Sequence, residues 1–230
     1  MGEKIAARIV TFGAALILAL STFAIMGLAA QPAHQVDDAH HGFSDVGQWS
    51  QMLEGSGRDQ WQKPEEVIKH LKLKPGDVIA DIGAGTGYFT RRFAVAVGPQ
   101  GKALGFEIEA AMVEHMRQEA RRLNLANYEP RLVRADDPGL EPRSVDVIFL
   151  SNVYHHIGNR VDYFKNLSKG LKRNGRIVIV DFYRKPQPVG PPLEQKVSEE
   201  TIIKELEEAG YRLTRSLGFL PYQYFLEFAR

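Results

Sequence analysis

Residues 62–230 alternate between short apolar runs and stretches with apolar residues at helical spacing, which predicts strands and helices in turn. We expect seven strands, at 78–82, 102–106, 131–135, 144–152, 176–183, 211–217 and 222–229. We expect helices at 64–71, 89–97, 110–125, 161–171 and 199–209. After the fourth helix, Asn174 or Gly175 should provide a left-handed stop, and Ser198 should cap the last helix. Strands that alternate with helices indicate an α/β fold with a mostly parallel sheet.

A glycine-rich loop directly follows the strand at 78–82. Gly83, Gly85 and Gly87 alternate before the next helix begins. Glycine is needed where backbone takes a positive φ or lies against a ligand, and the N–H groups of a helix start suit polar or anionic groups. A dinucleotide-binding loop would place its third glycine at position 88 or 90, and neither residue is glycine. The loop therefore indicates a nucleotide cofactor other than NAD or FAD.

A second carboxylate stands at the end of the next strand. Glu107 follows the strand at 102–106, and this position suits a side chain that accepts both hydroxyl hydrogens of an adenosine ribose. The alternative is an ordinary acid at a helix start, where the dipole favours negative charge, a role that Glu109 could also have.

Asp81 followed by G-x-G-x-G resembles the first motif of the class I (Rossmann-like) S-adenosylmethionine (SAM) methyltransferases, and the resemblance extends over residues 62–230. It implies that the cofactor is SAM and that the loop wraps its methionine end. It further implies a contact of Asp136 with the adenine amino group. The cofactor-binding residues that it implies are Asp81, Gly83, Ala84, Gly85, Gly87, Glu107, Asp136 and Asn152.

The strand at 144–152 ends on a polar tip, and Tyr154-His155-His156 follow almost at once. This segment resembles the small-molecule methyltransferases of the ubiquinone-biosynthesis type, in which this tip faces the methyl group and the substrate. The resemblance makes Asn152, Tyr154 and His155 the candidate catalytic residues. An imidazole titrates near neutrality, so His155 or His156 could take a proton from the acceptor, although for His156 we favour a packing role. Asp181 is a weaker candidate, since it could simply cap the next turn.

The resemblance implies a three-layer α/β sandwich with a seven-stranded, mostly parallel sheet and an antiparallel last strand. The implied activity is methyl transfer from SAM to a small-molecule acceptor. In such an in-line displacement the methyl carbon is already activated, so positioning supplies most of the catalysis. The alternative is a membrane-tethered or exported protein that binds SAM without turnover.

Composition agrees with one catalytic domain and narrows its partners. The 230 residues are 44% hydrophobic and 25% charged, and the formal net charge is +1. No basic stripe stands out, so we expect no nucleic-acid partner. The chain has no cysteine, which excludes disulfides and thiolate metal sites, and we assign no metal ligands.

Residues 1–30 predict a signal peptide or an N-terminal membrane anchor. An uncharged, mostly apolar run at 9–30 follows Lys4 and Arg8, and it is long enough to span a bilayer. Acidic residues without Lys or Arg follow at 31–57, so the positive-inside rule predicts that the catalytic domain is exported, although a cytoplasmic location stays open. Export conflicts with a cofactor made in the cytoplasm.

Residues 31–61 read as a linker with a candidate lid, ahead of a methyltransferase domain at 62–230. His34, His40 and His41 form a cluster that could bind a metal, but a solvated linker is the better interpretation. The apolar residues that follow could form a lid helix over the cofactor cleft or pack into the core; they are Phe43, Trp49, Met52, Leu53 and Trp61.

Overall fold

A computed structural model describes residues 54–55 and 57–230 of the chain, all within one compact unit. The predicted signal or anchor, the histidine cluster and the lid residues other than Trp61 lie outside the described residues. Within the described ranges, no helix is both long and apolar enough to cross a bilayer.

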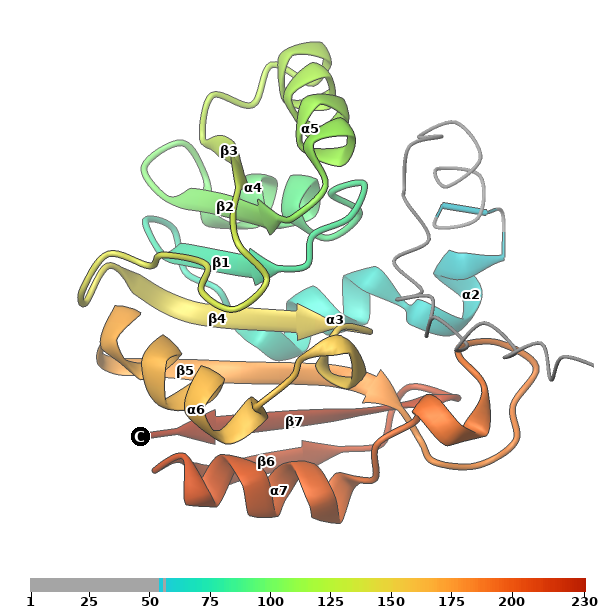
Figure 1. Cartoon of the computed structure of the whole chain (residues 1–230). Coiled ribbons are helices and arrows are strands. Elements are labelled where there is room, and N and C mark those ends of the chain that lie inside the picture. Colours follow the sequence, from blue (N-terminus) through green and yellow to red (C-terminus); the bar gives the residue numbers. More distant parts are fainter. Residues whose placement is uncertain (1–53, 56) are drawn as a thin grey trace, which may run out of the picture. The chain divides into compact units, whose positions relative to one another are not determined.

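Seven strands form one sheet in the order β3-β2-β1-β4-β5-β7-β6 (Figure 1). The strands from β3 to β5 pair in parallel, whereas β7 runs antiparallel to both β5 and β6. The expected mostly parallel sheet with an antiparallel last strand is confirmed. The strands are β1 (Val78–Ile82), β2 (Lys102–Glu107), β3 (Tyr128–Leu132), β4 (Val145–Ser151), β5 (Leu171–Phe182), β6 (Arg212–Leu217) and β7 (Gln223–Ala229).

Helices cover both faces of the sheet, because successive strand residues point to opposite sides and both sides are apolar. Ile148 and Leu150 of β4 pack with the helices α6 and α7, and the neighbouring Val147 and Phe149 pack with α3, α4 and α5. The result is the predicted three-layer sandwich. The helices are α2 (Arg58–Gln62), α3 (Pro64–Leu71), α4 (Thr90–Val97), α5 (Ala110–Arg122), α6 (Arg160–Leu167) and α7 (Glu199–Glu208).

The predicted end of α6 is wrong. The helix ends at Leu167, a 3₁₀ turn follows, and β5 already begins at Leu171. Register places Leu171 beside Val145 and Arg176 beside Val147, so the four residues between them bulge from the strand. Gly175 has no left-handed backbone; a Cβ there would lie 2.9 Å from the Leu171 side chain, so glycine serves a close approach. The predicted cap at Ser198 is confirmed, because its hydroxyl accepts from the Thr201 N–H at 3.3 Å.

The predicted strand at 131–135 lies three residues too late. β3 spans Tyr128–Leu132 at the edge of the sheet, where Pro130 can be accommodated because one side of an edge strand makes no ladder hydrogen bonds. The buried ring of Tyr128 anchors the strand against the α4 and α5 layer. Asp136 consequently lies in a loop and not at a strand end.

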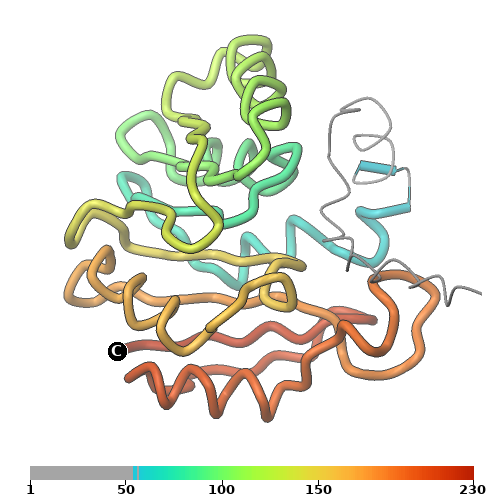
Figure 2. Tube along the Cα trace, in the orientation of Figure 1, coloured from blue at the N-terminus to red at the C-terminus, as the bar shows by residue number. Residues whose placement is uncertain are grey.

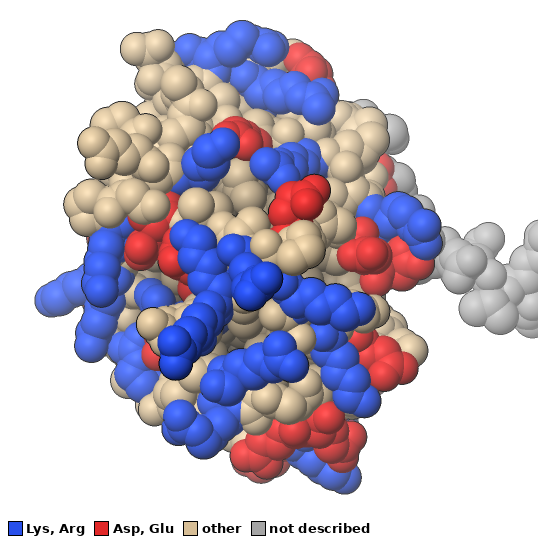
Figure 3. Space-filling model, turned by 90° about the vertical axis from the view of Figure 1, so that its left-hand side faces the viewer, with Lys and Arg blue, Asp and Glu red and all other residues tan. Residues whose placement is uncertain are grey.

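Basic side chains gather on the edge where the parallel strands begin, a surface that the sequence did not predict (Figure 3). The helices that cover the sheet end at this edge, and cations are favoured at helix C-termini. Several of these charges are neutralised locally, for example Lys102 by Glu129 at 2.7 Å and Lys172 by Asp146 at 2.6 Å. The opposite edge, where the parallel strands end, holds the candidate site. Figure 2 shows the path of the chain, in which α2 lies at the edge where the parallel strands end.

Candidate active site

The glycine loop after β1 takes the backbone conformation that only glycine adopts readily. Gly83, Gly85 and Gly87 have φ values of 66°, 57° and 79°. A Cβ on Gly83 would lie 2.5 Å from the Val153 side chain, and one on Gly87 would lie 1.7 Å from the Tyr128 hydroxyl. Any side chain at these two positions would therefore displace either the segment after β4 or the core.

The loop is tied to the tip of β2. The N–H groups of Gly83 and Ala84 donate to the carbonyl of Phe106 at 2.8 and 3.0 Å. The Gly85 N–H donates to Glu107 Oε2 at 2.8 Å. These bonds fix the loop against the next strand.

Glu107 is buried, with 8% of its surface exposed, and its carboxylate is almost fully occupied by backbone donors. Oε1 accepts from the N–H groups of Ile108 at 2.7 Å and Glu109 at 3.1 Å, while Oε2 accepts from Gly85. A carboxylate offers about four acceptor positions, so one remains. In this arrangement Glu107 can accept a hydrogen bond from one ribose hydroxyl. The sequence had predicted hydrogen bonds from both hydroxyls.

Two exposed apolar side chains flank Glu107. Ile108 follows it directly, and Leu132 lies beside it on β3; they are 43% and 55% exposed. Large apolar side chains exposed next to a buried carboxylate suit a flat apolar group such as a purine base. Sequence reasoning missed this pair because it placed the end of β3 three residues later.

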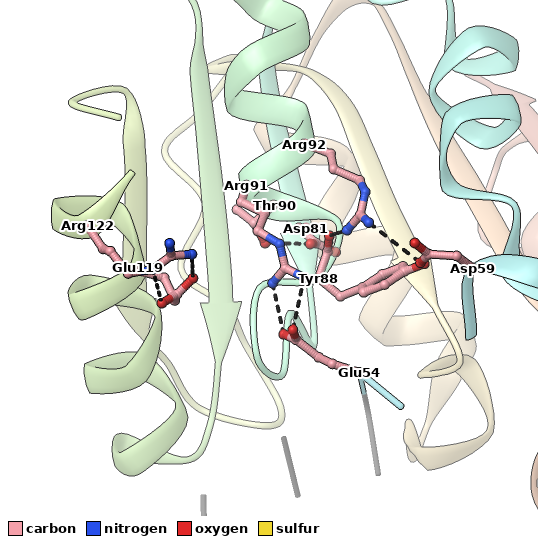
Figure 4. Close-up of polar contacts among 9 residues, drawn as sticks. All are labelled: Glu54, Asp59, Asp81, Tyr88, Thr90, Arg91, Arg92, Glu119 and Arg122. Carbon is pink, nitrogen blue, oxygen red and sulfur yellow. Dashed lines mark hydrogen bonds and ion pairs between the residues drawn. The ribbon is translucent and has the colours of Figure 1, made fainter. Parts of the chain in front are cut away.

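Asp81 lies beneath the glycine loop, and 3% of its surface is exposed. The Thr90 hydroxyl donates to its carboxylate at 2.6 Å (Figure 4). Burial raises the pKa of Asp81 to about 7, against an ordinary value of 3.8, even though the Thr90 hydrogen bond opposes the shift. A cation at this site would favour the charged carboxylate.

Glu54 and the residues of α2 dock onto the helix that begins at the glycine loop (Figure 4). Arg91 forms a two-pronged ion pair with Glu54, at 2.8 and 3.0 Å. The Tyr88 hydroxyl donates to Asp59, and the Arg58 guanidinium lies 3.8 Å above the Tyr88 ring centroid. This part of the predicted linker therefore packs on the domain.

Asn152, at the tip of β4, completes a ring of three amides. Its backbone has a φ of 60°, which asparagine tolerates better than most residues. Gln62 of α2 donates to Gln223 of β7 at 2.6 Å, Gln223 donates to Asn152, and Asn152 donates to Gln62 at 3.4 Å. Both glutamines are fully buried. The ring joins α2, β4 and β7 at the edge where the parallel strands end.

His155 and Asp181 form a buried pair beside this ring. His155 Nδ1 lies 3.3 Å from Asp181 Oδ2, and the two side chains are 6% and 3% exposed. The other Asp181 oxygen accepts from the Phe182 N–H at 2.8 Å, so the carboxylate is held in place. With a proton on Nδ1, His155 Nε2 is an acceptor. His156 is largely exposed and its ring lies 4.1 Å from that of His155; partial desolvation and the neighbouring His155 lower its pKa.

Two of the candidate residues, Tyr154 and Asp136, make their contacts away from the amide ring and Glu107. Tyr154 is fully buried, and its hydroxyl donates to Glu205 of α7 at 2.5 Å, so the structure gives it a place in the core. Asp136 is exposed and forms an ion pair with Arg134 at 2.5 Å, which lowers its pKa. Neither side chain is joined to the amide ring or to Glu107 by a hydrogen bond.

Comparisons with known proteins define the class. The "Methyltransferase domain" family matches residues 73–214, so the chain belongs to this family. A solved SAM-dependent methyltransferase from Aquifex aeolicus is 26% identical and superposes with a TM-score of 0.75, over 80% of this chain and 97% of that one.

Two curated relatives with similar sequences are methyltransferases as well. A ubiquinone/menaquinone biosynthesis C-methyltransferase from Ectopseudomonas mendocina is 26% identical over 87% of this chain and 76% of its own. A demethylmenaquinone methyltransferase from Lactobacillus johnsonii is 25% identical over 66% of this chain and 64% of its own. The protein is thus a SAM-dependent methyltransferase that resembles the ubiquinone-biosynthesis type.

The residues at the site fit this cofactor. The glycine loop holds three alternating glycines at positive φ directly after β1, and Glu107 keeps one acceptor position beside an exposed apolar pair. Ser151 Oγ at the tip of β4 is buried and lacks a hydrogen-bond partner among the described residues. Buried polar atoms are normally satisfied, so this hydroxyl is one place where a polar ligand would bind.

Proposed function

We propose that this methyltransferase acts on a small-molecule acceptor bound at the tips of β4 and β5, with His155 as the base. The observation that carries the proposal is the buried pair of His155 and Asp181. Asp181 fixes the imidazole so that Nε2 is free to take a proton, which is the arrangement that a general base needs.

SAM supplies a methyl group that is bonded to its sulfonium sulfur. When the methyl group is transferred, the rest of the cofactor leaves as a neutral thioether. The glycine loop and Glu107 would hold the cofactor, and Asn152 would border the acceptor. If the acceptor atom is a hydroxyl or an acidic carbon, its proton passes to His155 Nε2 as the new bond to the methyl carbon forms. Asp181 stabilises the resulting imidazolium, because a fixed carboxylate next to an imidazole favours its charged form.

A small-molecule acceptor is supported by the relatives. Both curated relatives are named for quinone biosynthesis, and neither name refers to a nucleic acid or a protein substrate. Among the described residues, the partly exposed ring of Trp61, which lies 5.6 Å from the buried ring of Phe182, offers an apolar surface near the β5 tip. We therefore favour an acceptor with an apolar or aromatic body.

An exported or membrane-anchored location belongs to the same proposal. Its support is the sequence of residues 1–57, with two cations before the apolar run and only acids after it. Protease added to intact spheroplasts should degrade the domain if it is exported. Protection until the membrane is permeabilised would place the domain in the cytoplasm.

The activity itself is tested with isotopically labelled SAM and small-molecule extracts. We expect label in an extractable acceptor with the wild-type chain, a loss of about 10²-fold or more with His155→Ala, and little change with the control His156→Ala. SAM binding without any transfer would favour the alternative, a SAM-binding protein without turnover.

A further inference from the structure

Lys196 is a buried lysine that the proposed chemistry does not use. Only 5% of its surface is exposed, although it belongs to the loop that connects β5 to α7. Its Nζ donates to the Lys185 carbonyl at 3.0 Å and to Gln187 Oε1 at 3.2 Å. An ammonium has three N–H donors, so one remains without a partner among the described residues.

Both partners of Lys196 are neutral. Within the described residues no carboxylate forms an ion pair with it, since its hydrogen bonds go only to the Lys185 carbonyl and Gln187. A buried charge is costly unless it is paired, and a neutral side chain could bridge the loop at less cost. Loop stability alone therefore does not explain a lysine at this position.

The surroundings of Lys196 connect it to the proposed acceptor site. Its Nζ lies 5.7 Å from the Phe182 ring centroid, and the Phe182 ring lies 5.6 Å from that of Trp61. Phe182, the last residue of β5, pairs with Gln223 of the amide ring across β5 and β7. A cation and two aromatic rings thus lie beside the amide ring at the tip of β5.

We infer that Lys196 binds an oxyanion, a carboxylate or a phosphate, that the acceptor carries on its apolar body. The anion takes the remaining N–H donor and neutralises the buried charge, while the apolar body packs on the partly exposed ring of Trp61. This inference rests on the proposed function and specifies its substrate class: an anionic amphiphile of small size.

The test compares matched probes that differ only in charge. The full chain, in non-ionic detergent and saturated with S-adenosylhomocysteine, is titrated calorimetrically with 2-naphthoate, 2-naphthyl phosphate and the neutral 2-naphthalenemethanol. We expect at least one anion to bind about tenfold or more tightly than the alcohol, the usual effect of a charge-assisted hydrogen bond. The two anions tell carboxylate from phosphate recognition.

The variants assign the preference to one side chain. Lys196→Met should bind anion and alcohol alike, with the alcohol unchanged, and Lys196→Arg should keep the preference. Lys185→Met removes an exposed charge from the same loop and should behave as wild type. Three results would overturn the inference. The first is a wild type that shows no anion preference or binds none of the probes, and the second is a preference that survives in Lys196→Met. The third is an equal weakening of all three probes in Lys196→Met, which would show that Lys196 only bridges the loop. Binding of S-adenosylhomocysteine and labelled methyl transfer are measured separately, so their failure would count against the proposed function instead.

Discussion

Removal of the Glu107 carboxylate should weaken SAM binding through one lost hydrogen bond. The three backbone donors around this side chain leave one acceptor position for the cofactor. A hydrogen bond to a charged group contributes roughly 1.5–3 kcal/mol, which corresponds to about 10- to 150-fold in affinity. We expect Glu107→Ala to lose SAM affinity within or above this range, because the glycine loop also loses its contact with Oε2.

The same substitution should lower the stability of the free protein. Gly85, Ile108 and Glu109 each lose an acceptor for their N–H group, and water can replace it only in part. We expect a decrease of about 1–3 kcal/mol in the free energy of unfolding, the scale of an unsatisfied buried donor. Chemical denaturation measures this decrease, and calorimetric titration of the folded variant measures the affinity.

Glu109→Ala is the matched control for this prediction. Glu109 precedes α5 and carries the same charge, but its side chain makes no hydrogen bond to the glycine loop. Its removal should change SAM affinity by no more than about twofold, the scale of a dipole interaction at an exposed helix start. Wild-type affinity in a folded Glu107→Ala variant, or an equal loss in Glu109→Ala, would refute the assignment.

Three further predictions follow from the site. Asp181→Asn should lower kcat about tenfold or more and leave SAM affinity unchanged, as measured by initial rates and calorimetry; an unchanged kcat would remove Asp181 from its positioning role. Gly87→Ala should destabilise the fold by about 1–3 kcal/mol, because its Cβ would lie 1.7 Å from the Tyr128 hydroxyl at a φ of 79°, and a wild-type melting temperature would contradict this. Burial raises the pKa of Asp81 to about 7 from 3.8, so its neutral form contributes stability that is fully present below pH 3.8 and is lost as the pH rises through 7. Asp81→Asn should therefore flatten the pH dependence of the melting temperature over that window, and an unaltered profile would assign the dependence to another group.

The sequence predicted the elements whose signals are local. Buried strands such as β1 and β4 are continuous apolar runs, and the glycines at 83, 85 and 87 need no distant partner to be recognised. The errors arose where a distant contact overrides the local pattern. Leu171 reads as the end of a helix, but it pairs with Val145 across the sheet, and Tyr128 begins β3 because its ring fills a gap against Gly87.

The site was predictable only where each residue stands at a strand end. Glu107 and Asn152 were proposed in this way, whereas the partners that hold Asn152 were not. Gln62 and Gln223 lie 161 residues apart, and nothing in the sequence near either one indicates that their amides meet. Asp181 was noted as a weaker candidate, and its contact with His155 shows how the parallel strands β4 and β5 bring their tips together.

Glu54 and α2 support both the glycine loop and the proposed acceptor edge. On the cofactor side, Glu54 and Asp59 hold the first turns after the glycine loop through Arg91 and Tyr88. On the acceptor side, Gln62 closes the amide ring around the tip of β4. α2 has only five residues and could not be a stable helix alone, so these contacts order it. Conversely, undocking α2 would leave the buried Gln223 amide and the Asn152 tip without Gln62, so this short helix fixes the tip of β4 relative to the glycine loop.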